Sequence, residues 1–140
     1  MTNGVVRPRA ASAYAWLTAL AAGTVVAQAF LFGGFYWEGG DWIRAHLQLG
    51  RISTFLVVAV ITPLAFFAGF PRQLGITRMT VVLAVLWLLQ TALGDAMDSA
   101  RWLVIIHVPL AFVIFGLALL LTGKAHRALG ASRGSKELRR

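Results

Sequence analysis

Residues 102–121 read WLVIIHVPLAFVIFGLALLL, a stretch without a single charged side chain. A helix rises about 1.5 Å per residue, so about 20 apolar residues are enough to cross the hydrocarbon core of a bilayer. Only His107 and Pro109 interrupt the apolar run. The stretch therefore predicts a membrane-spanning helix, and it raises the question of why a histidine lies inside it, because a buried imidazole needs partners.

Three further apolar stretches precede this one, at roughly residues 11–32, 43–69 and 79–97. Hydrophobic residues make up 59% of the 140 residues and charged residues only 13%, which is too apolar for a water-soluble domain of this length. We therefore expect an all-α integral membrane protein whose four helices form an up-down-up-down bundle within residues 1–122. Residues 123–140 are expected to form a basic cytoplasmic tail that frays and rests on anionic lipid.

The basic residues predict the orientation of the bundle. They gather before the first span, between the second and third spans and in the tail, as Arg7, Arg9, Arg72, Arg78, Lys124, Arg127, Arg133, Lys136, Arg139 and Arg140. The other two connections carry the acidic residues Glu38, Asp41, Asp95 and Asp98. Because cytoplasmic loops are enriched in Lys and Arg, both termini are predicted to be cytoplasmic. The net charge of +8 is thereby read as a topology signal, and no nucleic-acid partner is expected.

Four polar residues recur at matching places in the two predicted helical hairpins. His46 follows Gln28 by 18 residues, and His107 follows Gln90 by 17. The histidines lie four and five residues after Trp42 and Trp102, which we expect at the outer membrane interface. The pattern indicates a tandem duplication of a hairpin, with both histidines at the same depth near the outer leaflet.

This common depth suggests a cofactor. In a square bundle the second and fourth spans lie on a diagonal of roughly 11 to 14 Å, and two histidines bound to one iron need about 13 Å between their backbones. Small residues follow on the same helix faces, with Gly50 and Ser53 after His46 and Ala111 after His107. The sequence therefore predicts His46 and His107 as the axial ligands of a haem in the bundle. The absence of cysteine excludes a disulfide, a thiolate metal site and a covalently attached haem.

The sequence suggests two alternative roles for most of the other polar residues. Arg44 and Arg101 are candidates for pairing with haem propionates, or they anchor helix ends. Arg51 lies deeper than His46 on a different helix face, so we expect it to meet a neighbouring span, a second protomer or water. Gln28 and Gln90 are candidates for the cofactor pocket, or they are hydrogen-bond partners of the histidines in a haem-free protein.

The first span carries Ala15, Ala19, Gly23 and Ala27 at intervals of four residues. Small residues at such intervals allow transmembrane helices to approach each other closely. We therefore expect these four positions to form a packing ridge.

The stretches AHLQLGRIS (45–53) and IIHVPLAFVIFG (105–116) resemble the ligand helices of one half of a haem A synthase, whose eight helices form two fused four-helix bundles. The chain is also similar to small uncharacterised four-span membrane proteins of bacteria. The resemblance implies a bacterial plasma membrane protein that binds haem b, and by analogy a homodimer that rebuilds the two-bundle parent. The chain differs from the catalytic half of the synthase in two ways. Ile43 occupies the position of a glutamate there, and the cysteine pair in the outer loop of many members is absent. We therefore do not expect this chain to oxidise a methyl group of haem.

Bis-histidine iron has no open position for substrate, so the predicted chemistry is one-electron transfer without independent catalysis. A membrane quinone or another respiratory-chain component is the expected redox partner, and haem sensing or delivery is a second reading. The alternative is a haem-free accessory or assembly subunit, in which a buried layer of His and Gln residues sets the helix register.

Overall fold

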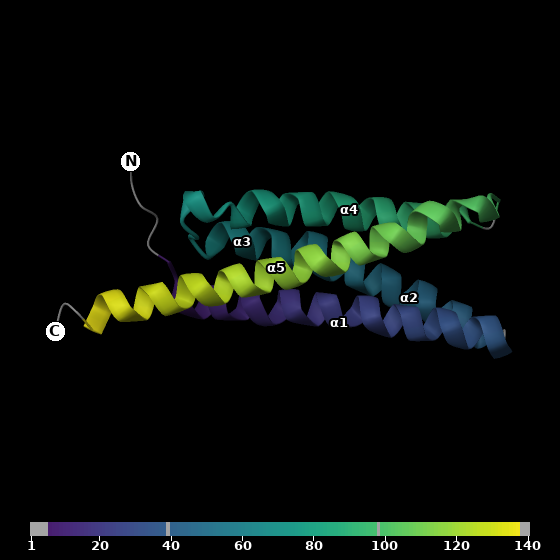
Figure 1. Cartoon of the computed structure of the whole chain (residues 1–140), viewed down its shortest axis with the longest axis horizontal. Helices are drawn as coiled ribbons and strands as arrows, with labels where there is room; N and C mark the ends of the chain where they lie inside the picture. The colour runs from purple at the N-terminus through teal and green to yellow at the C-terminus, as the bar shows by residue number, and fades with distance from the viewer. Residues whose placement is uncertain (1–5, 39, 98, 138–140) are drawn as a thin grey trace.

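The computed structural model describes residues 6–38, 40–97 and 99–137, leaving aside the side chains of residues 36, 133 and 135–137. This part of the chain is almost entirely helical and contains no strand (Figure 1). The helices in chain order are α1 Pro8–Glu38, α2 Asp41–Phe55, η1 Leu56–Ile61, α3 Thr62–Phe67, η2 Arg72–Leu74, α4 Ile76–Ala96, η3 Arg101–Leu103 and α5 Val104–Glu137. The predicted all-α class is confirmed.

Four helical stretches of the described residues are long and apolar enough to cross a membrane, namely Pro8–Phe35, Asp41–Phe67, Ile76–Ala96 and Arg101–Ser132. They coincide with the four predicted spans, although the first and last are longer than expected. Large apolar side chains such as Trp16, Phe66 and Ile105 point away from the protein interior. Helices that are apolar on all sides are typical of a lipid environment, so the chain has the architecture of a multi-pass membrane protein.

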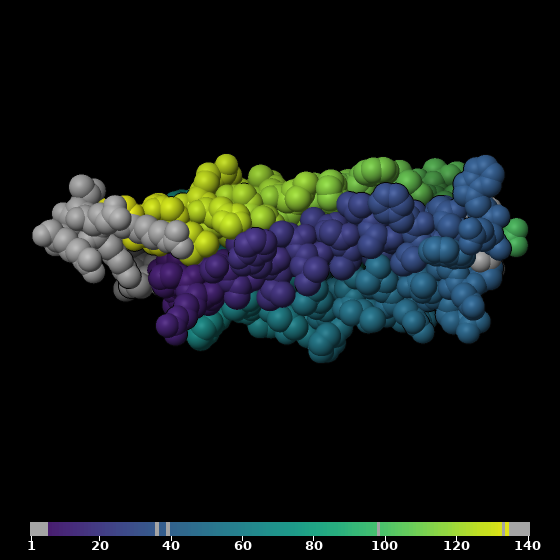
Figure 2. Space-filling view, turned by 90° about the horizontal axis from the view of Figure 1, so that it is seen from below, coloured from purple at the N-terminus to yellow at the C-terminus, as the bar shows by residue number. Residues whose placement is uncertain are grey.

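The spans are arranged so that α2 and α5 face each other across the bundle. Helix α1 packs on α5 and on α2, and α4 packs on α5, α3 and α2. In Figure 2, α1 runs along the visible face between α5 on one side and α2 and α3 on the other. Figure 1 shows α1 with α2, and α4 with α5, as two hairpins that diverge toward the end where α2 begins.

The opposite end of the bundle is tightly packed. Tyr14 and Thr80 share a buried hydrogen bond of 2.5 Å that links α1 to α4, and Thr18 and Thr122 share one of 2.9 Å that links α1 to α5. Small and aliphatic side chains fill the space between these contacts, including the fully buried Ala118 of α5. This end therefore holds the two hairpins together while the other end stays open.

The predicted packing ridge on the first span is wrong. Only Ala15 of its four residues is buried, whereas Gly23 has no atom within 4 Å of where a Cβ would be placed. The buried positions of α1 instead follow spacings of three and four residues, as Ala11, Tyr14, Ala15, Thr18, Ala21 and Ala22. An α-helix has about 3.6 residues per turn, so positions spaced strictly by four drift around the helix and leave the packed face.

The second span is not a uniform α-helix. Its middle segment η1 is π-helical, and the backbone N–H of Thr62 bonds to the carbonyl of Val57, five residues back. Pro63 is the next residue and has no N–H to donate. Because its ring would clash with the preceding turn of an α-helix, the wider π-helical turn occurs directly before it. The π-helical turn thus connects α2, which carries His46, to α3 at the tightly packed end.

The expected frayed tail covers residues 123–140, of which residues 123–137 are helical and residues 138–140 lie outside the described residues. Helix α5 continues without a break to Glu137, well beyond the predicted end of the fourth span at residue 122. Ala125, Ala128 and Leu129 are buried, and Lys124 donates a hydrogen bond of 2.9 Å to the carbonyl of Leu74. The basic segment therefore packs as part of the bundle, because its alanine and leucine side chains recur on one helix face.

Candidate functional site

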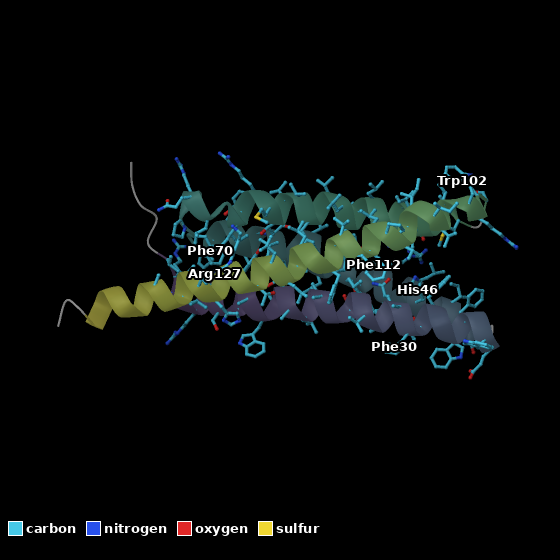
Figure 3. The ribbon with its side chains drawn as sticks, in the orientation of Figure 1. Phe30, His46, Phe70, Trp102, Phe112 and Arg127 are labelled. Carbon is cyan, nitrogen blue, oxygen red and sulfur yellow. The ribbon has the colours of Figure 1, made fainter. Side chains whose placement is uncertain are left out.

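A cavity of about 690 Å³ occupies the open end of the bundle, between the two hairpins. All four spans contribute to its wall, which is mainly apolar and aromatic. The polar residues of the lining are Gln28, His46, Gln90, Thr91, Asp95 and His107. Figure 3 shows His46 and Phe112 in this half of the molecule and Phe70 and Arg127 toward the other end. A cavity of this size and composition is typical of a small-molecule or cofactor site.

His46 of α2 and His107 of α5 face each other inside this cavity. Their ring centroids are 6.4 Å apart and their planes are inclined by 53°. An imidazole nitrogen bound to a metal lies about 2 Å from it, so two imidazoles on one metal have ring centres roughly 6 Å apart. The observed separation is therefore the one that a single metal between the rings requires.

His46 is held firmly by helix α1. Its Nδ1 lies 2.9 Å from the backbone carbonyl oxygen of Gln28, which can only accept, so Nδ1 carries the proton and donates it. The Phe32 ring contacts the imidazole at a centroid distance of 5.9 Å. In the neutral ring this leaves the lone pair on Nε2 free, as in metal-binding histidines, which commonly donate their other N–H to a carbonyl.

His107 is held much less firmly. The backbone of Gln90 is a hydrogen-bond partner of its ring, but the bond is weak, because the contact with the buried Nδ1 has poor geometry. The side-chain Oε1 of Gln90 is also buried without a partner in the described chain. Gly94 lies beside the ring, since a Cβ at that position would be 3.3 Å from His107 Cε1. Buried polar atoms usually have a partner, so these two atoms are the ones that a molecule bound in the cavity could contact.

The surroundings of the two histidines support the predicted repeat. In each hairpin the histidine ring interacts with the backbone of the matching glutamine, Gln28 for His46 and Gln90 for His107. In each hairpin the residue four positions after that glutamine also contacts the ring, Phe32 in the first and Gly94 in the second. No hydrogen bond joins a glutamine side chain to either histidine among the described residues, and for His46 the backbone carbonyl of Gln28 takes the role considered for the amide.

The predicted small residues divide into two groups. Gly50 and Ala111 line the cavity, and a Cβ on Gly50 would approach Gln28 Oε1 to 3.3 Å. Ser53 is buried outside the lining, where its hydroxyl donates to the carbonyl of Leu49 at 2.6 Å. Ser53 therefore serves the packing of α2, and Gly50 is the residue that makes space next to His46.

None of the arginines with a described side chain lines the cavity. Arg44 pairs with Asp41 at 3.2 Å on the exposed first turn of α2, and Arg101 is exposed in η3. Arg51 pairs with Asp95 of α4 at 3.3 Å. Of the three expected partners, a neighbouring span, a second protomer or water, the structure shows the neighbouring span. Because Asp95 belongs to the cavity wall, Arg51 is the arginine whose charge lies nearest to the site.

Several wall residues were not predicted as part of the site. Trp87, Thr91 and Gly94 of α4 and Phe112 of α5 line the cavity, whereas Trp102 is exposed. Thr91 and Gly94 lie one helical turn or less from Gln90, which was the available signal in the sequence. The aromatic residues carried no such signal in the sequence, because aromatic side chains occur both in the walls of cofactor sites and on lipid-facing helix surfaces.

The donor set limits what the site can hold. No group of three or more His, Cys, Asp or Glu side chains suited to a metal occurs among the described residues. A zinc ion needs three or four protein ligands, whereas the iron of a haem already has four equatorial nitrogens and needs two axial ones. Two opposed histidines in a large apolar cavity therefore fit a metal macrocycle better than a bare ion.

No family model, curated protein or solved structure matches the chain. The resemblance to one half of a haem A synthase accordingly stays a prediction. What the site can do is argued below from its geometry.

Proposed function

We propose that this protein binds one haem b between His46 and His107 and serves in one-electron transfer or in haem handling within a membrane. The observation that carries the proposal is the 6.4 Å separation of the two rings across a cavity of about 690 Å³. When bound, the haem supplies an iron that cycles between two oxidation states. His46 and His107 would each supply a nitrogen to that iron, and the mainly apolar wall of the cavity would surround the group.

The residues around the histidines support a role of the chain in holding the haem. The carbonyl of Gln28 orients His46 and favours the lone pair on Nε2. The aromatic side chains of Trp87, Phe112 and Phe115 in the cavity wall would exclude water from the macrocycle. A low local dielectric and fixed axial ligands are the means by which proteins set the potential of a haem iron.

The haem-free alternative is less well supported. A buried polar layer that only sets helix register should satisfy all its hydrogen-bonding atoms, because a partly satisfied network costs more than an apolar core. His107 Nδ1 has only a contact of poor geometry with the backbone of Gln90, and Gln90 Oε1 is left without a partner in the described chain. The cavity of about 690 Å³ also keeps the two hairpins apart at this end, whereas a purely structural bundle would gain stability from packing them closely.

The proposal includes the orientation and the partners. We place the bundle in a bacterial plasma membrane in an up-down-up-down topology, with both termini in the cytoplasm and the haem toward the outer leaflet. The distribution of basic residues supports this orientation. A membrane quinone or another respiratory-chain component would exchange electrons with the haem. A homodimer is proposed by analogy with the two-bundle synthase alone.

Absorption spectroscopy of the protein purified in detergent from haem-replete cells tests the proposal. We expect a Soret band and the sharp reduced bands of a low-spin b-type haem. His46→Ala should abolish this spectrum, and His107→Ala should abolish its low-spin form. His126→Ala is the matched control, because His126 is an exposed histidine of α5 far from the cavity, and it should leave the spectrum unchanged. A colourless wild-type protein with full helix content would refute haem binding.

A further inference from the structure

We infer that the two histidines are unequal ligands, with His46 a permanent ligand and His107 one that a small uncharged molecule can replace. The inference rests on the proposed function and goes beyond it. While both rings are bound, the iron has no open position, and release of one ring would give the protein a second property, the reversible binding of a small ligand.

The anchoring of His46 is built into the backbone. Its N–H donates to a main-chain carbonyl of α1, which cannot turn away as a side chain can. The Phe32 ring packs against it as well. Helix α1 packs directly on α2, as α4 does on α5, so the difference between the two histidines lies in the contacts of the rings themselves.

His107 has no comparable anchor. The backbone of Gln90 is the counterpart of the Gln28 carbonyl, but its hydrogen bond with the ring has poor geometry, so the buried Nδ1 is held less firmly than that of His46. The neighbouring residue across the helix interface is Gly94, which presents no side chain to hold the ring in place. Pro109 lies two residues further along α5 and lacks an N–H for the carbonyl of Ile105, so this turn of the helix is less constrained.

The exchange reaction is a simple substitution of ligands. His107 would release the iron through its Nε2, and the incoming molecule would take its place, without transfer of an electron or a proton. The mainly apolar wall of the cavity favours neutral molecules over ions. Carbon monoxide, which binds reduced iron, and imidazole, which replaces a missing ring, are suitable probes.

Carbon monoxide added to the reduced full-length protein gives the first test. We expect the Soret band to shift and to return when the gas is removed, because His107 gives way. Imidazole gives the second test. His107→Ala should retain haem through His46, in a high-spin form that imidazole converts to low spin. His46→Ala should lose most of its haem, and imidazole should not restore it.

Gly94→Ala provides a variant in which both histidines are kept. Its methyl group would meet the His107 ring at 3.3 Å and occupy space into which the ring can move. We expect a smaller fraction of the protein to take up carbon monoxide. Gly116→Ala is the control on α5, because a Cβ there meets nothing within 4 Å, and its uptake should equal that of the wild type.

Two results would overturn the inference alone. One is a coloured wild-type protein whose reduced spectrum does not respond to carbon monoxide. The other is an equal loss of haem from His46→Ala and His107→Ala, with equal rescue by imidazole. A colourless wild-type protein would overturn the proposed function and this inference together. The two failures are therefore distinguishable by the colour of the unmodified protein.

Discussion

Gly34 determines how closely the first two helices approach at the open end of the bundle. The Trp42 ring lies against its backbone, and a Cβ on Gly34 would be 2.8 Å from Cδ2 of that ring. The indole N–H of Trp42 also donates to a carboxylate oxygen of Glu38 at 2.8 Å. The ring therefore has little freedom to move, and the turn between α1 and α2 needs a residue without a side chain at this position.

We expect Gly34→Ala to destabilise the protein by about 1 to 3 kcal/mol, since the methyl group must displace a packed indole. Gly23→Ala is the control in the same helix, because a Cβ there has no neighbour within 4 Å. Alanine is the better helix former, so Gly23→Ala should be neutral or slightly stabilising. Thermal unfolding in detergent, followed by circular dichroism, compares the two. Equal melting temperatures would contradict the packing described for Trp42.

At the scale of single elements, α5 is the helix that departs most from expectation. Its basic C-terminal segment looks like a solvated tail in the sequence, yet it continues the helix and packs its apolar face on the bundle. Leu129 is only 7% exposed there, whereas Leu120, nine residues earlier within the span, is 44% exposed. The same residue type thus has opposite roles in one helix.

We expect Leu129→Ala to lower stability by about 2 kcal/mol or more, because removal of a buried leucine side chain leaves a cavity. Leu120→Ala removes the same atoms from a surface that detergent or lipid covers, so its effect should be small. The measurement is the free energy of unfolding in detergent for both variants. A larger effect for Leu120→Ala would show that the segment beyond the membrane is not packed as described.

At the scale of the whole molecule, charge is unevenly distributed along the bundle. Most basic residues of the described chain lie at the tightly packed end, where Arg7 donates to the carbonyl of Phe67 and Lys124 to that of Leu74, whereas Arg44 and Arg51 at the other end are paired with carboxylates. Described acidic residues, such as Asp41 and Asp95, lie at the end with the cavity. Under the positive-inside rule the tightly packed end faces the cytoplasm and the cavity faces outward.

Because the chain has no cysteine, single introduced thiols can test this orientation. Asp41→Cys and Ser99→Cys are exposed sites near the cavity end, and Arg9→Cys and Arg127→Cys are exposed sites at the other end. We expect a membrane-impermeant thiol reagent added to intact bacterial cells to label only the first pair. Labelling of the second pair in intact cells would reverse the topology, and lysed cells, in which all four should react, provide the control.

The sequence alone determined the helical class, the four spans and the level of the two histidines. These properties depend on apolar run length and on a constant rise per residue, and both can be counted along a chain. The positions of Gly50 and Ala111 in the cavity wall followed from helical periodicity in the same way. The predicted ridge on α1 failed because a spacing of four residues drifts around the helix over several turns.

Only the tertiary structure decided which partner each polar group meets. The sequence could not distinguish a backbone carbonyl from an amide side chain as the acceptor for His46, and it could not pair Arg51 with Asp95. Nor could it reveal that the contact of His107 Nδ1 with the backbone of Gln90 has poor geometry. Such contacts depend on how far the two hairpins diverge and on the rotation of each helix about its axis. Packing between residues that are distant in the sequence determines both.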